Sequence, residues 1–180
     1  MGAGTEPQQN LIANALRLLL SDERFAGGLS GAAVLFWAGT FWVEPVRVES
    51  TSMEPTLRAG DHLLVDDRAY DHAPPRRGDL VVFDGSGTPL VKRVVAVGGD
   101  TVAIEDGVLE VDGRLVREPT VDPATVDGMY YGPSRVPDGT VFVLGDNRRH
   151  SVDSRQFGPV PVTKVTGRVV LRWWPRSGRP

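Results

Sequence analysis

Cysteine is absent from this chain of 180 residues, and lysine is scarce. Without cysteine there is no disulfide framework, no thiolate nucleophile and no cysteine-based zinc site. A covalent catalyst in this chain is therefore restricted to a hydroxyl, an amine or a carboxylate. Eighteen of the twenty basic residues are arginine, which leaves Lys92 and Lys164 as the only lysines.

The chain also lacks an excess of positive charge. The formal net charge is -3, and acidic and basic residues are mixed along the chain rather than gathered in blocks. Nucleic-acid-binding proteins carry a basic patch or stripe, so we expect no nucleic acid partner. The turn aspartates do not have the spacing of a calcium-binding loop. We therefore predict no metal and no cofactor.

One long uncharged segment is present, at residues 25–43. As a helix it would span about 28 Å, close to the hydrocarbon thickness of a membrane. A buried core helix is the alternative, but the segment lacks a polar face, and Trp37 and Trp42 lie towards its far end, where interfacial aromatics belong. We predict a transmembrane helix, preceded by a short amphipathic helix within residues 1–24 and followed by one domain at residues 44–180.

Beyond residue 45 the chain changes to short β-branched runs separated by glycine, proline and aspartate. This pattern predicts a mostly β domain. The Asp-Gly pairs at residues 106–107 and 112–113 lie between such runs and favour tight hairpins. Residues 118–137 show no period and are predicted to form a surface loop. The predicted strands cover residues 80–83, 90–97, 101–104, 108–111, 141–144 and 168–173.

The chemistry of the chain centres on Lys92, which lies inside the apolar strand predicted at residues 90–97. Burial there would favour the neutral amine, a base that arginine cannot replace. Ser52 follows the apolar segment closely, and serine with lysine is a known pair of nucleophile and base. Other readings remain: a serine at this place often caps a short helical turn, and lysines in strands often reach solvent.

A dense polar loop, GDNRRHSVDSR at residues 145–155, follows the predicted strand 141–144. Its turn formers, hydroxyls and opposite charges are typical of a functional loop, although a turn stabilised by its own Asp and Asn side chains explains much of the composition. His150 within it is a second possible base. Because Lys92 already fills that role, we expect His150 to face solvent.

The chain resembles bacterial type I signal peptidase, the membrane-anchored serine peptidase with a Ser/Lys dyad. The resemblance covers the apolar segment and nearly all of residues 44–161, and its motifs occur in order. Two residues depart from the family pattern, because Glu49 replaces a proline and Thr51 a glycine. The second puts the local backbone geometry in doubt. The motifs are SMEPTL at 52–57, GD at 60–61, the strand around 92, GGD at 98–100 and the loop at 145–155.

By motif position, the resemblance implies Ser52 as nucleophile and Lys92 as general base. It implies an oxyanion hole made of the Ser52 backbone N–H and the Ser50 hydroxyl. Ser151 would hydrogen-bond to the lysine amine and orient it. An ion pair would brace the loop, and four apolar side chains would line the substrate pocket. The ion pair joins Asp153 to Arg155, and the pocket residues are Val46, Val48, Met53 and Val91.

The implied function is that of a serine endopeptidase, signal peptidase I, which removes signal peptides from exported pre-proteins at Ala-x-Ala-like junctions. Residues 1–24 would be cytoplasmic, residues 25–43 would cross the cytoplasmic membrane once, and residues 44–180 would lie on the extracytoplasmic side against lipid. Two alternatives stay open at this point. One is a related Ser/Lys processing peptidase with a single dedicated client, and the other is a non-catalytic, membrane-tethered β module that binds peptides.

Overall fold

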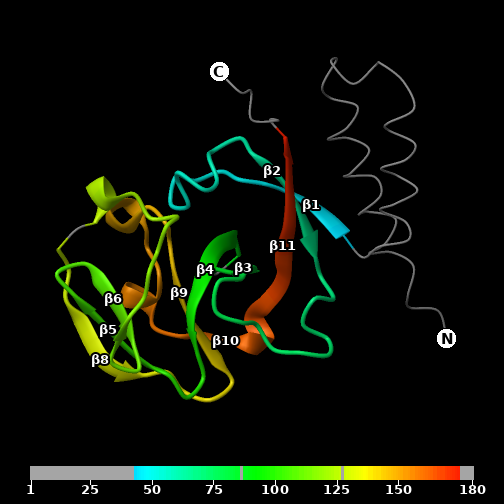
Figure 1. The fold of residues 1–180 in the computed structure, drawn as a ribbon. Helices are drawn as coiled ribbons and strands as arrows, with labels where there is room; N and C mark the ends of the chain where they lie inside the picture. Colours follow the sequence, from blue (N-terminus) through cyan, green and yellow to red (C-terminus); the bar gives the residue numbers. More distant parts are fainter. Residues whose placement is uncertain (1–42, 86, 127, 175–180) are drawn as a thin grey trace, which may run out of the picture.

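The computed structural model describes residues 43–85, 87–126 and 128–174, which form two antiparallel sheets (Figure 1). The mostly β fold expected from the sequence is therefore confirmed. The predicted helices within residues 1–24 and 25–43 lie outside the described residues, except that Val43 is the first residue of a strand. Among the described residues, no helix is long and apolar enough to span a bilayer.

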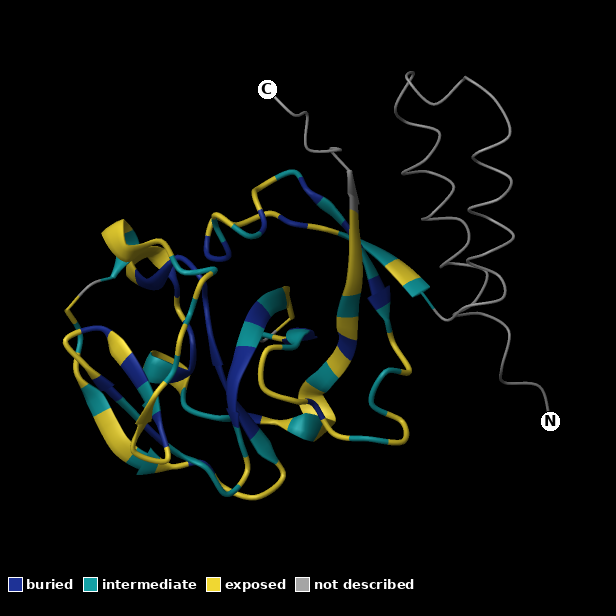
Figure 2. Cartoon of the chain, in the orientation of Figure 1, coloured by how far each residue is buried: buried dark blue, intermediate teal, exposed yellow. Residues whose placement is uncertain are grey.

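The larger sheet has seven strands in the order β1-β2-β11-β3-β4-β9-β10. The middle three residues of β3 and the last four residues of β9 are buried, whereas β2 alternates between buried and half-buried positions. Figure 2 colours the chain by burial. Continuous burial is expected for strands covered on both faces. The strands are β1 (Val43–Arg47), β2 (His62–Asp66), β3 (Leu80–Asp84), β4 (Pro89–Val97), β9 (Thr140–Leu144), β10 (Val160–Pro161) and β11 (Val165–Trp174).

The smaller sheet has four strands in the order β7-β6-β5-β8 and stands to one side of β4 and β9 in Figure 1. Its hairpins turn at Asp106 and Asp112, both with positive φ and each followed by a glycine, as the Asp-Gly pairs predict. Val102 and Ile104 point into a core shared with β4 and β9. The strands are β5 (Thr101–Glu105), β6 (Val108–Val111), β7 (Arg114–Leu115) and β8 (Tyr131–Arg135).

The predicted surface loop at residues 118–137 is wrong in one part, because it contains strand β8. This strand has no apolar alternation to mark it, since its sequence is YGPSR. It lies at the edge of the smaller sheet, where a proline without an N–H is tolerated. Gly132 passes so close to β5 that a Cβ there would be 2.4 Å from the carbonyl oxygen of Val102. Backbone approach, rather than side-chain burial, defines this strand.

Four short helical turns complete the described fold. Only α3 carries a full capping box, in which the Asp153 carboxylate and the Gln156 side chain each bond to the other residue's backbone. These segments are η2 (Pro123–Thr125), η3 (Arg148–His150), α3 (Ser154–Phe157) and η4 (Val162–Lys164).

The register of β4 decides where the polar loop at residues 145–155 lies. The first half of β4 pairs with β3, and Lys92 stands opposite Val81. Pairing with β9 begins one residue later, where Arg93 stands opposite Leu144. Because β9 ends at Leu144, the chain leaves the sheet directly beside Lys92. The topology thus brings the predicted base and the predicted loop together.

Candidate active site

Ser52 lies in the loop that connects β1 to β2, here called the Ser52 turn. The backbones of Val48 and Asp61 close the base of this turn, with the Val48 N–H 2.8 Å from the Asp61 carbonyl oxygen. Met53 and Leu57 anchor it from below, since both are buried in a hydrophobic cluster under the sheet. The turn is therefore held at both ends and from beneath, which fixes Ser52 at a buried position, 6% exposed.

The amine of Lys92 donates a hydrogen bond to the Ser52 hydroxyl, with 2.6 Å between Nζ and Oγ. Lys92 is only 3% exposed. Burial lowers its pKa to about 8, an effect partly opposed by the nearby Asp153 carboxylate and reinforced by the Arg155 guanidinium. A lysine with this pKa is neutral in an appreciable fraction of molecules near neutral pH, and a neutral amine accepts protons. The arrangement is that of a nucleophile beside its base.

Ser50 stands next to this pair, with its hydroxyl oxygen 3.1 Å from that of Ser52. Among the described residues, no group accepts a hydrogen bond from the backbone N–H of Ser52. The two groups expected to form an oxyanion hole are therefore adjacent. Thr51, which stands where the family has glycine, does not adopt a positive φ, so a glycine is not needed for this backbone.

The polar loop presents Ser151 to the same place. Gly145 has no side chain, and a Cβ built there would lie 2.3 Å from Ser151 Oγ and 2.5 Å from the carbonyl oxygen of Ser52. The loop and the Ser52 turn can approach this closely only because residue 145 is glycine. Nothing in the sequence indicates this role for Gly145, because it depends on Ser52, which is far away along the chain.

The expected hydrogen bond between Ser151 and Lys92 is not formed in this structure. The Ser151 hydroxyl is buried and has no hydrogen-bond partner among the described residues. Lys92 instead directs its amine to Ser52. An unpaired buried hydroxyl costs about 1–3 kcal/mol, and an unsatisfied group of this kind calls for an explanation.

Asp153 and Arg155 form the predicted ion pair, with two bonds from the guanidinium: Nε to Oδ1 at 2.8 Å and Nη2 to Oδ2 at 3.1 Å. Both side chains are almost fully buried. Asp153 also accepts from the backbone N–H of Gly145, and Arg155 donates to the carbonyl oxygen of Arg148. The pair therefore ties the beginning of the loop to its end.

A second ion pair, which was not predicted from the sequence, joins the buried Asp146 to the half-buried Arg93. Arg93 Nε lies 2.8 Å from Asp146 Oδ1 and Nη2 lies 2.7 Å from Oδ2. Thr56 donates its hydroxyl to the same carboxylate. Three separate segments, the Ser52 turn, β4 and the polar loop, thus meet at Asp146. The sequence signal was an acidic residue directly after a buried strand, but it did not reveal the partners.

His150 is exposed, as expected, and its ring Nδ1 lies 3.2 Å from the side-chain oxygen of Asn147. No contact with Ser52 is found for it within the described part of the chain. Over the same residues, no three histidine, aspartate or glutamate side chains come together in a way that would hold a metal ion.

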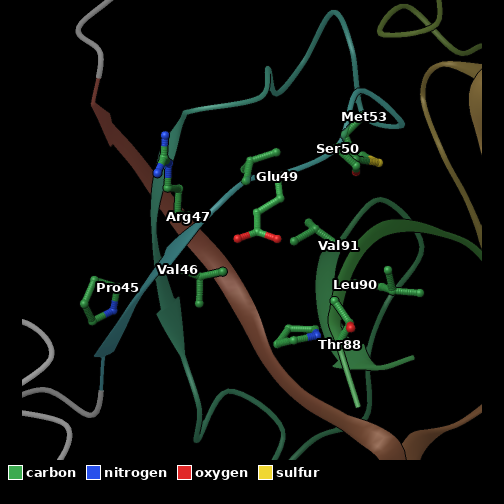
Figure 3. Close-up of a pocket in the computed structure, with 11 residues that line it drawn as sticks. Pro45, Val46, Arg47, Glu49, Ser50, Met53, Thr88, Leu90 and Val91 are labelled. Atoms are coloured by element: carbon green, nitrogen blue, oxygen red, sulfur yellow. The ribbon is translucent and has the colours of Figure 1, made fainter. Parts of the chain in front are cut away.

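A groove of about 450 Å³ runs between β1 and the first half of β4, ending at Ser50 (Figure 3). It contains all four side chains predicted to line the substrate pocket. Thr88 and Pro89 close its far side. The predicted pocket residues that border it are Val46, Val48, Met53 and Val91.

Comparison with known proteins agrees with this geometry. A family model described as "Signal peptidase, peptidase S26" matches residues 25–174. The signal peptidase I of Bacillus caldolyticus is 41% identical over 141 residues, which cover 71% of this chain and 78% of the relative. The signal peptidase I of Mycobacterium tuberculosis is 35% identical, covering 81% of this chain and 70% of the relative.

A crystal structure of a signal peptidase I from Enterococcus faecalis is 32% identical, with a TM-score of 0.47, and covers 54% of this chain and 97% of its own. The family model covers most of the present chain, and the Bacillus relative matches over more than two thirds of its length. The chain therefore belongs to the signal peptidase family, peptidase family S26, and is a serine peptidase.

Proposed function

We propose that this protein is a signal peptidase I that removes N-terminal signal peptides from exported pre-proteins at Ala-x-Ala-like junctions. Ser52 is the nucleophile and Lys92 the general base. One observation carries the proposal: a buried amine with its pKa lowered to about 8 lies 2.6 Å from the hydroxyl it would deprotonate. Few structural lysines combine burial, a depressed pKa and a direct contact with a serine hydroxyl.

The reaction begins with neutral Lys92, which takes the proton of the Ser52 hydroxyl as the oxygen attacks the scissile carbonyl carbon. The Ser50 hydroxyl and the Ser52 N–H stabilise the resulting oxyanion. Protonated Lys92 then gives its proton to the leaving amine, the C–N bond breaks, and the mature protein departs. A water molecule, deprotonated by the same amine, attacks the ester carbonyl of the acyl-enzyme. Lys92 then returns the proton to Ser52 Oγ as the C–O bond breaks, and the signal peptide leaves.

Ser151 completes this cycle as the group that orients Lys92. Its hydroxyl is buried at the site and has no hydrogen-bond partner among the residues that the structure describes, so it is available to the amine. When Lys92 becomes an ammonium it has three protons to donate, and the Ser52 oxygen is then bonded to the carbon of the tetrahedral intermediate and is no longer a free hydroxyl. A hydrogen bond from the ammonium to Ser151 would hold the amine in place between the two halves of the reaction.

The groove next to Ser50 is the site for the residues before the cleavage point. Its two walls are strand edges: β1 ends the seven-stranded sheet, and within the described residues the 89–92 part of β4 pairs with β3 and with no other strand. An extended peptide would hydrogen-bond to such edges and place alternate side chains against the apolar lining. Val91 and Met53 line this groove together with Ser50, and the Ala-x-Ala preference would place small residues against them.

We also propose that residues 25–43 anchor the enzyme in the cytoplasmic membrane, with the described domain on the extracytoplasmic side, facing lipid. The support is the uncharged run of membrane-spanning length in the sequence. Residues 1–24 would then be cytoplasmic.

The test uses the full chain in detergent and an exported pre-protein with an Ala-x-Ala junction, with the product N-terminus read by mass spectrometry. We expect wild type to cut at that junction and the Ser52→Ala variant to be inactive. Ser134→Ala, in the smaller sheet, is the matched control and should retain full activity. If folded wild type cleaves no exported pre-protein, a peptidase with one dedicated client or a non-catalytic peptide-binding module would replace this proposal.

A further inference from the structure

Glu49 is the acidic residue of the substrate groove. It lies between Val48 and Ser50, and its carboxylate points into the groove between Val46 and Val91 in Figure 3. Arg47, the only basic residue among the lining side chains, extends away from the centre of the groove in the same view. A groove lined mainly by apolar side chains thus contains one negative charge close to the nucleophile.

This charge is not used within the described part of the chain. No ion pair and no hydrogen bond joins the Glu49 carboxylate to another described residue, although most other carboxylates near the site are paired. Glu49 is also exposed, so a ligand in the groove can reach it. A structural role in holding the groove together would require a partner, and the described residues provide none.

We propose that Glu49 determines specificity by charge: it favours substrates with a lysine or arginine among the few residues before the cleavage point, and it disfavours acidic residues there. The inference rests on the proposed peptidase function. An extended peptide advances about 3.3 Å per residue, and Glu49 is three residues from Ser52, so the carboxylate faces roughly the second to fourth residue before the scissile bond. Ion pairs at exposed positions are modest in strength, which predicts a preference of about two- to fivefold.

The test measures kcat/KM for pre-proteins that differ only in having Lys, Gln or Glu at the second, third or fourth residue before the junction. Wild type should prefer Lys over Glu at one of these positions, and the preference should shrink at high salt. Glu49→Gln should remove the preference, and Glu49→Lys should reverse it. Glu105→Lys changes the net charge equally on the smaller sheet and should behave like wild type.

The outcomes separate this inference from the function on which it rests. If wild type cleaves all substrates but the Lys/Glu ratio is the same in wild type and Glu49→Lys, Glu49 has no role in selection and the peptidase function stands. If the Glu105→Lys control shifts the ratio as much as Glu49→Lys, the effect comes from net charge and the proposal is overturned. If wild type cleaves nothing, the proposed function itself fails.

Asn147 supplies a second and independent observation. Its side-chain amide nitrogen donates to the carbonyl oxygen of Thr51 at 3.2 Å, and its backbone N–H donates to that of Ser52 at 3.0 Å. Glu54 also donates its N–H to Thr51. The amide is fixed from its other end, where His150 contacts the oxygen. Asn147 is buried, at 6% exposure, and both of its hydrogen bonds to the Ser52 turn go to backbone carbonyl oxygens.

The geometry points to Asn147 as a positioning residue for the oxyanion hole. In a planar trans peptide group the C=O and the N–H point in opposite directions. The donors that hold the Thr51 carbonyl therefore aim the Ser52 N–H, which belongs to the same peptide group, away from the loop and towards the site of oxyanion formation. Asn147 acts through this peptide group and does not touch the substrate.

Asn147→Ala keeps the backbone bond to Ser52 and removes only the side-chain bond to Thr51. We expect kcat to fall about tenfold, less than the loss of a whole oxyanion donor, while KM stays unchanged. Binding of a peptide aldehyde, which places an oxyanion in the same hole after addition of Ser52, should weaken in parallel. A peptide of the same sequence that lacks the aldehyde, and therefore cannot react with Ser52, should bind equally well to both proteins. If aldehyde affinity is unchanged, or if both peptides weaken together, the positioning role is wrong.

Discussion

The four-stranded sheet buries valine, isoleucine and leucine side chains, whereas the catalytic end of the seven-stranded sheet buries hydroxyls and charges. Among the described residues, every buried polar or charged side chain lies outside residues 101–135. Strands that pair in the smaller sheet are mostly joined by tight turns, but Lys92 and Ser52 are 40 positions apart and Asn147 and Thr51 are 96 apart. One region is encoded by local pattern and stabilised by apolar burial. The other depends on distant partners and holds groups whose burial is costly.

Lys92→Met has the largest expected effect on the difference between the two regions. It replaces the buried amine with an apolar side chain of similar length. Activity should fall by at least about 10³-fold, because the base is lost. Stability at pH 7 should nevertheless rise, by about 2 kcal/mol, because the charged amine no longer has to be buried. Cleavage assays and thermal unfolding of the same preparation measure both effects.

The sign of the stability effect can be checked by pH. In wild type the pKa of Lys92 is about 8 when folded and 10.5 when unfolded. The unfolded state therefore binds more protons between these values, and wild-type stability should rise with pH across that window. Lys92→Met should lack this rise. A variant that is active, or that is less stable than wild type at pH 7, would contradict the assignment of Lys92 as a buried base.

Gly145→Ala tests a glycine that is needed for close packing at the site. Its control tests a glycine that is needed only for its backbone conformation. The new methyl group would meet Ser151 Oγ at 2.3 Å and the Ser52 carbonyl oxygen at 2.5 Å, so the loop and the turn must separate. We expect a loss of about 10²-fold in kcat/KM, since small misplacements of catalytic groups are costly. The matched control is Gly113→Ala in the smaller sheet, where φ is +70° but nothing lies within 4 Å. It should cost about 1 kcal/mol in stability and leave activity intact. Equal activity losses in the two variants would break the comparison.

Asp153→Asn removes the negative charge of the ion pair behind the site, so the buried Arg155 guanidinium no longer faces a carboxylate. Stability should fall by about 3 kcal/mol. The Asp153 carboxylate raises the pKa of Lys92 and the Arg155 guanidinium lowers it, so losing the carboxylate lowers this pKa further below 8. Wild-type kcat/KM should rise with pH to a plateau, with the midpoint of the rise at about pH 8, because the neutral amine is the active form. The variant's midpoint should lie at lower pH, with a reduced plateau.

Arg155→Gln is the companion variant, because removing the positive charge should move the midpoint to higher pH. In the double variant the two shifts should largely cancel, and the loss of stability should be smaller than the sum of the single losses. A midpoint that stays at the wild-type value in both single variants would show that the ion pair does not act on Lys92.

The smaller sheet and the catalytic end of the larger sheet also differ in how much of their structure could be predicted from the sequence. The hairpins at Asp106 and Asp112 were found because turn chemistry and alternation are local signals. Burial chemistry singled out Lys92 within its strand, and the motif order paired it with Ser52. The roles of Asp146, Gly145 and Asn147 were not predicted, because each depends on a contact between segments that only the fold brings together. Strand β8 was missed for the same reason, since backbone pairing rather than an apolar pattern defines it.

The smallest effect on catalysis is expected from Leu109→Ala in β6. Leu109 is 1% exposed in the core between the two sheets, and its truncation should cost about 2–4 kcal/mol of stability. Measured well below the melting temperature, kcat and KM should both match wild type, because neither the Ser52 turn nor the polar loop packs its catalytic groups on this side chain. Leu115→Ala in β7, where the side chain is 72% exposed, is the control and should change neither property. If Leu109→Ala instead lowers kcat as much as Gly145→Ala, the smaller sheet would have to transmit its packing to the site through Leu144, which shares its core and directly precedes Gly145.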